Sequence, residues 1–441
     1  MSRAAAKTFL LIVSLTMSVR ILAQPVTALT LDQALNLARQ NSLKLRISER
    51  ELEKTALAKS ELRASGLPQV SAKSEVSYAP DARHFGYDPA ITDGGQLSGQ
   101  VSVEQSVYDG GTRNLKMVQL SLDLDKLHAK RLTTERDLIA DVKQRFVDLL
   151  LAQQEEELQQ ASVNQLQSYY DIVRSMNEGG IAPYTDVLKT QVDLSNAIVM
   201  RDKAGSERFN SILALEAAVG LAPDTSLRVV GSLGSLAEIR GDSLVVMPLD
   251  SMLRTIEILN AELDIRRSEM DVQVAQREHR PLIDLTADAG YLSSRDNLAV
   301  PVAERYSGLG VSVGVNASLS LFNGGATRFR IQQAQMETDA LRLQRQALQR
   351  ALAAQLHSLK QQIQSAAQLR STQQEIIKTA EQNYLLNRST YAGGGASATE
   401  VLAAQQLLRD ARLSDLETKA TIAKLWIQWK QAMTTYDGVQ R

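Results

Sequence analysis

The sequence predicts a mainly α-helical chain that also contributes four strands to a membrane β-barrel. Three observations support this class. The sequence contains an internal duplication, each half of it has two runs of alternating polar and apolar residues, and each half has a long stretch without proline or glycine. The 441 residues include no cysteine and 4% aromatic residues, and 44% are hydrophobic. Few aromatic residues and many polar, Ala- and Leu-rich stretches favour long helices over compact cores.

The first 28 residues have the pattern of a secretory signal peptide. Arg3 and Lys7 precede an apolar run from Thr8 to Val19, and cleavage is expected near residues 23–28. The run is too short to cross a bilayer as a helix, although a short N-terminal anchor is the alternative interpretation. No later stretch approaches 18 consecutive apolar residues, so we expect an exported protein without a transmembrane helix.

An internal duplication organises the rest of the chain. Gly111 and Gly325 follow strand-like runs and lie 214 positions apart, and the same interval separates Gly180 from Gly394. The expected first helix of each half also ends at a proline, Pro68 or Pro281. Matching landmarks at a fixed interval indicate a repeated unit. The predicted parts are a first repeat over 29–220, a mixed segment over 221–248, a second repeat over 249–434 and a tail over 435–441.

Four runs alternate with period two and are therefore expected to be strands with one apolar face. They cover residues 69–78, 97–108, 283–291 and 309–321. Continuous alternation places Tyr108 on the polar face. About ten residues is the length that a tilted strand needs to cross a bilayer. The alternative is an ordinary sheet packed against a helix.

Two stretches of about 66 residues, 113–178 and 327–392, are predicted to be long helices. Ile139, Val142, Phe146 and Leu149 follow a heptad spacing, as do Leu352, Leu356, Leu359 and Ile363. At 1.5 Å per residue each helix would be about 100 Å long, which indicates a coiled-coil rod or conduit. A glycine turn and a returning helix follow each one, and Thr185 or Ser397 is expected to help cap the return.

Four strands cannot close a barrel, so the strand count predicts an oligomer. Two copies would give eight strands with a filled interior, whereas three copies give twelve strands and room for a water-filled lumen. The polar faces of the strands supply candidate lumen residues. These are Lys73, Glu75, Glu104, Asp284 and Asp288.

These features together resemble the TolC-like outer-membrane efflux proteins, also called outer membrane factors. The resemblance rests on the opening Leu29–Leu35, the duplicated strand–glycine–helix landmarks and the segment from Tyr391 to Leu402. It implies a homotrimer with a 12-stranded β-barrel in the outer membrane of a Gram-negative cell. A periplasmic α-barrel would continue it toward a periplasmic adaptor (membrane fusion) protein and an inner-membrane pump. Many relatives are lipidated at a cysteine, and the absence of cysteine excludes that anchor here.

The same resemblance implies candidate site residues at the periplasmic tip. By position, Tyr391 and Glu400 would form a channel gate with Asp186 as the matching acid of the first half. The arginine that some relatives place before the acid is replaced by Gly395–Ala398. A simpler interpretation treats both acids as helix-start carboxylates that the helix dipole favours. The tip glycines would let adaptor hairpins pack closely, and they are Gly179, Gly180, Gly393 and Gly394.

The expected function is therefore passive conduction of substrates across the periplasm and the outer membrane, with energy supplied by the pump. One alternative is the duct of a type I protein secretion system with an ABC exporter; another, of a different class, is a secreted coiled-coil structural or adhesive protein. No catalytic motif, cofactor site or metal site is expected. The formal net charge of −1 gives no support for nucleic-acid binding.

Overall fold

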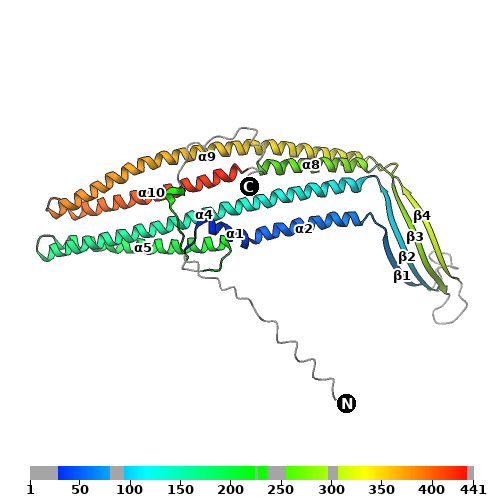
Figure 1. Cartoon of the computed structure of the whole chain (residues 1–441), viewed down its shortest axis with the longest axis horizontal. Coiled ribbons are helices and arrows are strands. Elements are labelled where there is room, and N and C mark those ends of the chain that lie inside the picture. Colours follow the sequence, from blue (N-terminus) through cyan, green and yellow to red (C-terminus); the bar gives the residue numbers. More distant parts are fainter. Residues whose placement is uncertain (1–27, 80–93, 224–226, 237–254, 296–305, 435–441) are drawn as a thin grey trace, which may run out of the picture. The chain divides into compact units, whose positions relative to one another are not determined.

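The computed structural model describes residues 28–79, 94–223, 227–236, 255–295 and 306–434 (Figure 1). The expected signal peptide and the 435–441 tail lie outside the described residues, as does most of the 221–248 segment. The chain forms two compact units, each built from segments of both repeats. One unit, here the strand unit, contains residues 43–137, 242–361 and 428–441; the other, here the tip unit, contains 1–42, 138–241 and 362–427.

The strand unit contains an antiparallel four-stranded sheet in the order β1-β2-β3-β4 (Figure 1). The strands are β1 (Gln69–Ala79), β2 (Gly94–Asp109), β3 (Leu282–Arg295) and β4 (Tyr306–Ser318). Each repeat supplies a pair, and the two pairs meet where β2 is bonded to β3. β1 and β4 are consequently the two edges.

The strand register keeps polar and apolar residues on opposite faces, as the alternation predicts. Val101 lies between Ala72 and Ala289, and Ser102 lies opposite Asp288. The expectation that Tyr108 lies on the polar face is wrong. A register shift between Ser106 and Tyr108 places this tyrosine opposite Ile283, on the apolar side. The fourth strand also ends at Ser318, three residues earlier than expected.

Two 22-residue helices precede the strand pairs, α2 (Leu43–Ala64) and α8 (Ile256–Arg277). Two 67-residue helices follow them, α4 (Thr112–Glu178) and α9 (Ala326–Ala392), so the duplication is preserved in element lengths. No helix in the described part of the chain has a long enough apolar stretch to cross a bilayer.

Within the strand unit, α8 is bonded to both long helices. Arg267 Nε lies 2.7 Å from Asp123 Oδ1 of α4, and Gln119 of α4 donates to Asp271 Oδ1 at 2.7 Å. On its other side the Ser268 hydroxyl lies 2.8 Å from that of Thr338 of α9, and Arg342 pairs with Glu269 at 2.8 Å. These polar contacts join α8 to both long helices.

The glycine pairs that mark the duplication lie where a strand turns into a long helix. Gly110 and Gly111 have φ angles of 70° and 77°, a left-handed conformation that glycine adopts without steric cost. Arg277 Nη1 donates to the Gly111 carbonyl at 2.7 Å, and Arg280 Nη1 donates to that of Gly110 at 3.3 Å. The end of α8 therefore fixes the turn between β2 and α4.

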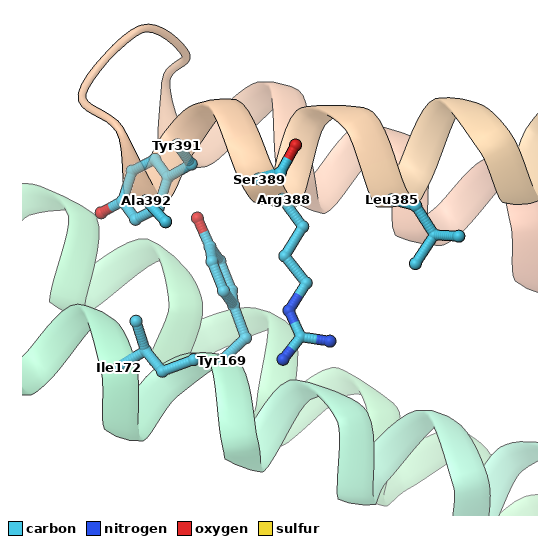
Figure 2. A pocket seen from close by; sticks show the side chains of 7 residues that line it. All are labelled: Tyr169, Ile172, Leu385, Arg388, Ser389, Tyr391 and Ala392. Atoms are coloured by element: carbon cyan, nitrogen blue, oxygen red, sulfur yellow. The ribbon is translucent and has the colours of Figure 1, made fainter.

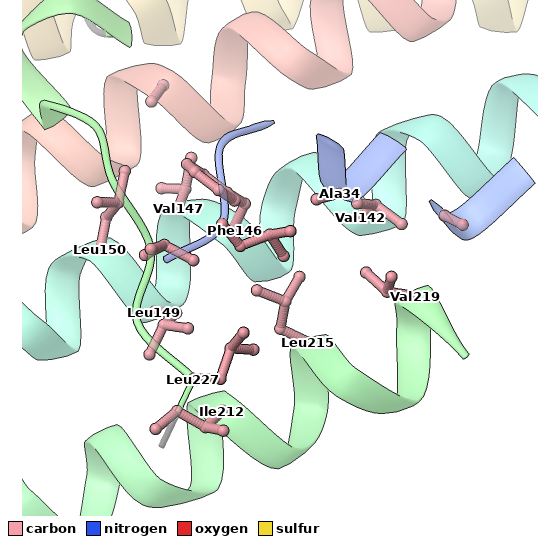
Figure 3. Close-up of a cluster of buried hydrophobic side chains, with 14 of the residues drawn as sticks. Ala34, Val142, Phe146, Val147, Leu149, Leu150, Ile212, Leu215, Val219 and Leu227 are labelled. Carbon is pink, nitrogen blue, oxygen red and sulfur yellow. The ribbon is translucent and has the colours of Figure 1, made fainter. Parts of the chain in front are cut away.

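The tip unit has a buried core around α4 (Figure 3). Helices α1 (Leu31–Asn41), α5 (Tyr184–Val219) and α10 (Ala398–Ala432) contribute to it, as do Leu227, Val229 and Leu233 of the inter-repeat segment. Leu29 forms a parallel bridge with Val229, and Leu233–Leu236 forms the short helix α6. The Thr30 side chain and Gln33 form a capping box at the start of α1. Phe146, 1% exposed, is among the largest side chains of this core.

Gly220→Ala is expected to destabilise the end of α5 by about 1–2 kcal/mol, because Gly220 ends the helix at φ 76° in the left-handed region. An added Cβ would also lie 2.8 Å from the Cβ of Asn41, whose amide donates to the Val219 carbonyl at 3.3 Å. Hydrogen exchange of the last turn of α5 measures this. Gly205→Ala is the control: Gly205 lies inside the same helix, and its added Cβ would lie 3.3 Å from Glu156 Oε1, the far end of a flexible side chain that can move aside, so this change should not destabilise the helix. Equal effects of the two changes would contradict the assignment.

Candidate functional site

The two helical hairpins of the tip unit turn through glycine-containing loops between α4 and α5 and between α9 and α10. Gly180 and Gly394 have φ angles of 72° and 78°, and no heavy atom lies within 4 Å of a Cβ placed on either. The backbone conformation alone therefore accounts for glycine at these two positions. The role of the four tip glycines in adaptor docking stays a prediction.

Tyr391, the expected gate residue, is 6% exposed and packs against Tyr169 of α4 (Figure 2). The ring centroids lie 5.5 Å apart at an interplanar angle of 64°, an edge-to-face arrangement that aromatic pairs prefer. Both rings belong to a buried cluster that joins α4, α5, α9 and α10, with Val173, Val187 and Val401. Tyr391 therefore links the two hairpins of one chain.

The two phenols sit in an environment that favours their neutral form. Burial raises the pKa of Tyr169 well above its usual range, and the neighbouring Tyr391 and the charge of Asp186 add to the shift. Burial also raises the pKa of Tyr391, and Asp186 acts in the same direction. The hydroxyls are close enough to influence each other, but neither meets hydrogen-bond geometry with a described residue. The contact between the hairpins therefore depends on the rings.

A pocket of about 290 Å³ opens beside this pair, between α4 and α9 (Figure 2). Ile172 and Leu385 give it apolar walls, and the exposed Arg388 lines it one helical turn before Tyr391. An arginine thus does lie near the tyrosine, although none stands at residues 395–398. A second, open groove lies between α5 and α10, and Lys189 Nζ of α5 donates to Thr399 Oγ1 there at 3.2 Å.

Glu400 and Asp186 both lie in the first turn of a returning helix, but in different surroundings. The Ser397 amide donates to Glu400 Oε2 at 2.7 Å, and the Glu400 amide donates to Ser397 Oγ at 3.3 Å. These reciprocal bonds form a capping box, which confirms Ser397 as a cap. The expectation that Thr185 caps α5 is wrong, because α5 begins after Pro183 without a side-chain cap. Asp186 lies near enough to both tyrosines to raise their pKa values.

Glu400→Ala and Ser397→Ala are each expected to loosen the start of α10 by about 1 kcal/mol, because each removes part of the capping box. Glu400→Gln retains an oxygen acceptor and should leave the helix start intact while removing the charge. Hydrogen exchange of the amides of residues 398–401 measures the cap, and ion selectivity of reconstituted protein measures the charge. Loosening by Glu400→Gln equal to that by alanine would show that the charge is needed for the cap.

The five candidate lumen residues lie on the polar face of the sheet in the strand unit. Lys73 Nζ lies 3.1 Å from Glu75 Oε2. Asp288 accepts from Gln100 Nε2 of β2 at 2.8 Å and from Ser312 Oγ of β4 at 3.4 Å. Asp284 pairs across the sheet with Asn316, and Glu104 with Thr286. The polar face is therefore continuous across all four strands.

The sequence pattern does not indicate that Tyr169 is the partner of Tyr391. The internal repeat does not duplicate Tyr391, because the equivalent position 214 residues earlier is Asn177. The side-chain amide of Asn177 instead donates to the Ala182 carbonyl across the first tip turn at 2.7 Å. The sequence feature that could point to this site is the pair of adjacent tyrosines at 169–170, because the chain has only eleven tyrosines. Tyr384, the equivalent of Tyr170, belongs to the same cluster.

The family of outer membrane efflux proteins matches this chain over residues 34–221 and 250–433. The chain belongs to this family. The resemblance to TolC-like proteins is thereby confirmed, as is the mainly α fold with strands. Members of the family are outer membrane channels and not enzymes, and the chain is an outer membrane protein that extends into the periplasm.

Known proteins agree with this assignment at low sequence identity. Nodulation protein T of Rhizobium leguminosarum is 21% identical over 325 residues, 69% of this chain and 66% of the relative. Outer membrane protein TolC of Escherichia coli is 21% identical over 402 residues, 87% of this chain and 79% of its own. The solved structure of VceC of Vibrio cholerae has a TM-score of 0.73 at 14% identity and covers 92% of this chain and 96% of its own. The chain spans about half to two thirds of the first curated relatives that it matches, 66% and 49% of their lengths.

Proposed function

We propose that the protein is the outer membrane channel of a tripartite efflux system and acts as a homotrimer with a 12-stranded barrel. The observation that carries this proposal is the exposed apolar face of the sheet. The four apolar side chains of β4 from Leu309 to Val315 are 71–88% exposed in the single chain, far more than a water-soluble sheet leaves uncovered. Outer membrane lipid is the environment that such a face fits.

The sheet also has two unpaired edges, β1 and β4, which lipid does not tolerate. If β1 and β4 pair with the edge strands of further copies, no unpaired edge is left. Three copies then give a barrel wide enough for a water-filled lumen. Lys73, Glu75, Glu104, Asp284 and Asp288 then face that lumen, and both charge signs are present among them.

In this proposal the tip unit is the periplasmic entrance. Tyr391 with Asp186 and Glu400 forms the gate, and the tip turns with the groove between α5 and α10 receive the hairpin of a periplasmic adaptor. An inner-membrane pump supplies the substrate and the energy. Relatives named for pyoverdine export and for antibiotic and toluene efflux support small organic molecules as the substrate class.

Three measurements test the proposal. Native mass measurement of the purified protein should give a trimer, and planar bilayers that contain it should show single-channel ion conductance. A deletion strain should become more sensitive to small organic toxins while its protein secretion is unchanged. Lost secretion with unchanged sensitivity would favour a type I duct, and a monomer that never conducts would refute the channel.

A further inference from the structure

The pocket between α4 and α9 in the tip unit has the size and the lining of a small-molecule site. One face of each helix lines it: Tyr169 and Ile172 on α4, and Leu385, Arg388 and Tyr391 on α9, each spaced by three residues. Its volume of about 290 Å³ is near the lower limit for ligand pockets, so it suits a small molecule.

Two hydroxyl groups of the residues that line this pocket have no hydrogen-bond partner. Tyr169 and Tyr391 are 4% and 6% exposed, and neither hydroxyl bonds to any residue that the structure describes. Burial removes the bond that each hydroxyl would make to water, and leaving this bond unreplaced costs free energy. Burial also raises the pKa of both phenols, so that each keeps its proton and can donate. The two side chains therefore offer donors to an acceptor oxygen.

Arg388 adds a positive charge at the same place. Its side chain extends from α9 toward α4 beside Tyr169 (Figure 2). Arg388 is exposed, and within the described ranges it forms no ion pair. The apolar side chains of Ile172 and Leu385, next to this charge, are 38% and 56% exposed. A guanidinium binds a carboxylate through two parallel N–H groups, so the lining complements a carboxylate that carries an apolar body.

We propose that this pocket binds a small carboxylate whose oxygens accept hydrogen bonds from Arg388 and the two phenols and whose apolar body contacts Ile172 and Leu385. A ligand in this place contacts α4 and α9 together. It therefore stabilises the contact between the two hairpins and favours the closed gate. This effect on the gate rests on the proposed channel, whereas the binding itself does not.

Asp186 opposes such a ligand and thereby gives a test of its charge. The charge of Asp186 acts on both phenols and raises their pKa values, so it also repels a carboxylate bound to them. Asp186→Asn should therefore tighten the binding of an anion by about fivefold. Weaker binding of the anion in this variant would contradict the proposed placement.

Three probes of nearly the same shape test the ligand class. 4-Fluorobenzoate is an anion, 4-fluorobenzamide is neutral and 4-fluorobenzamidinium is a cation. Fluorine NMR titration of the full-length protein in nanodiscs of zwitterionic lipid measures their dissociation constants. The benzoate should bind at least about tenfold more tightly than the other two. Equal affinity for the benzamide, or tighter binding of the benzamidinium, would overturn the carboxylate, and no benzoate binding below about 10 mM would overturn the site.

Substitutions locate the bound probe. Arg388→Gln should weaken 4-fluorobenzoate at least about tenfold, Arg388→Lys should weaken it less, and Tyr169→Phe should weaken it about threefold. Lys378→Gln is the matched control, because Lys378 is an exposed cation on the same helix, ten residues before Arg388, and does not line the pocket. Unchanged affinity in Arg388→Gln would place the probe elsewhere and overturn the site.

Single-channel recording tests the effect on the gate. Saturating 4-fluorobenzoate should lower the open fraction of the natural channel at least about threefold, and it should leave the open fraction of Arg388→Gln unchanged. Binding without a lower open fraction would overturn the closing effect and leave the site standing. A protein that binds the probe but never conducts would refute the proposed channel and not the site.

Discussion

Tyr391→Ala is expected to raise the mean ion conductance of the reconstituted channel by about two orders of magnitude. The change removes a buried ring that links the two hairpins through Tyr169. Loss of such an aromatic side chain from a packed cluster costs about 3 kcal/mol, which is roughly a hundredfold change in an opening equilibrium. Single-channel recording in planar bilayers measures the open fraction and the conductance separately.

Tyr391→Phe is the matched control for this experiment. It keeps the ring contact and removes a hydroxyl that has no hydrogen-bond partner among the described residues, so the channel should stay closed. If Tyr391→Phe opened the channel as fully as alanine, the hydroxyl would be the gating group. Unchanged conductance of Tyr391→Ala in a folded trimer would place the gate elsewhere.

Phe146→Ala is expected to destabilise the core of the tip unit by about 3–5 kcal/mol. Phe146 is buried among residues of α1, α5 and the inter-repeat segment, so the cavity would affect elements from distant parts of the sequence (Figure 3). Hydrogen exchange of the α1 and α5 amides should accelerate by about two to four orders of magnitude.

Phe146→Leu is the milder comparison: it keeps a large apolar side chain and leaves a smaller cavity than alanine, so it should destabilise this core less than Phe146→Ala does. Exchange in the sheet of the strand unit should stay unchanged in both variants, because none of its strands contributes to this cluster. Acceleration throughout the chain would instead indicate global unfolding. Unaltered exchange of α1 in Phe146→Ala would contradict its place in the core.

The sequence predicted the repetitive part of the molecule well, for a physical reason. Strand and helix periodicity are local properties, and here each pattern runs for many residues and occurs twice. The long helices begin and end within one residue of the expected limits, at Thr112–Glu178 and Ala326–Ala392. Local irregularities were less accessible: the bulge near Ser106 moved Tyr108 to the other face, and β4 ended early at Ser318.

The sequence by itself determined the duplication, the alternating strands, the long helices and the capping segment at Ser397 and Glu400, because these depend on residues close together in the chain. Only the tertiary structure decided the pairing of β2 with β3, the meeting of Tyr169 with Tyr391 and the assembly of the core around Phe146. Such contacts join residues far apart in sequence, and their geometry follows from side-chain packing that no local period encodes.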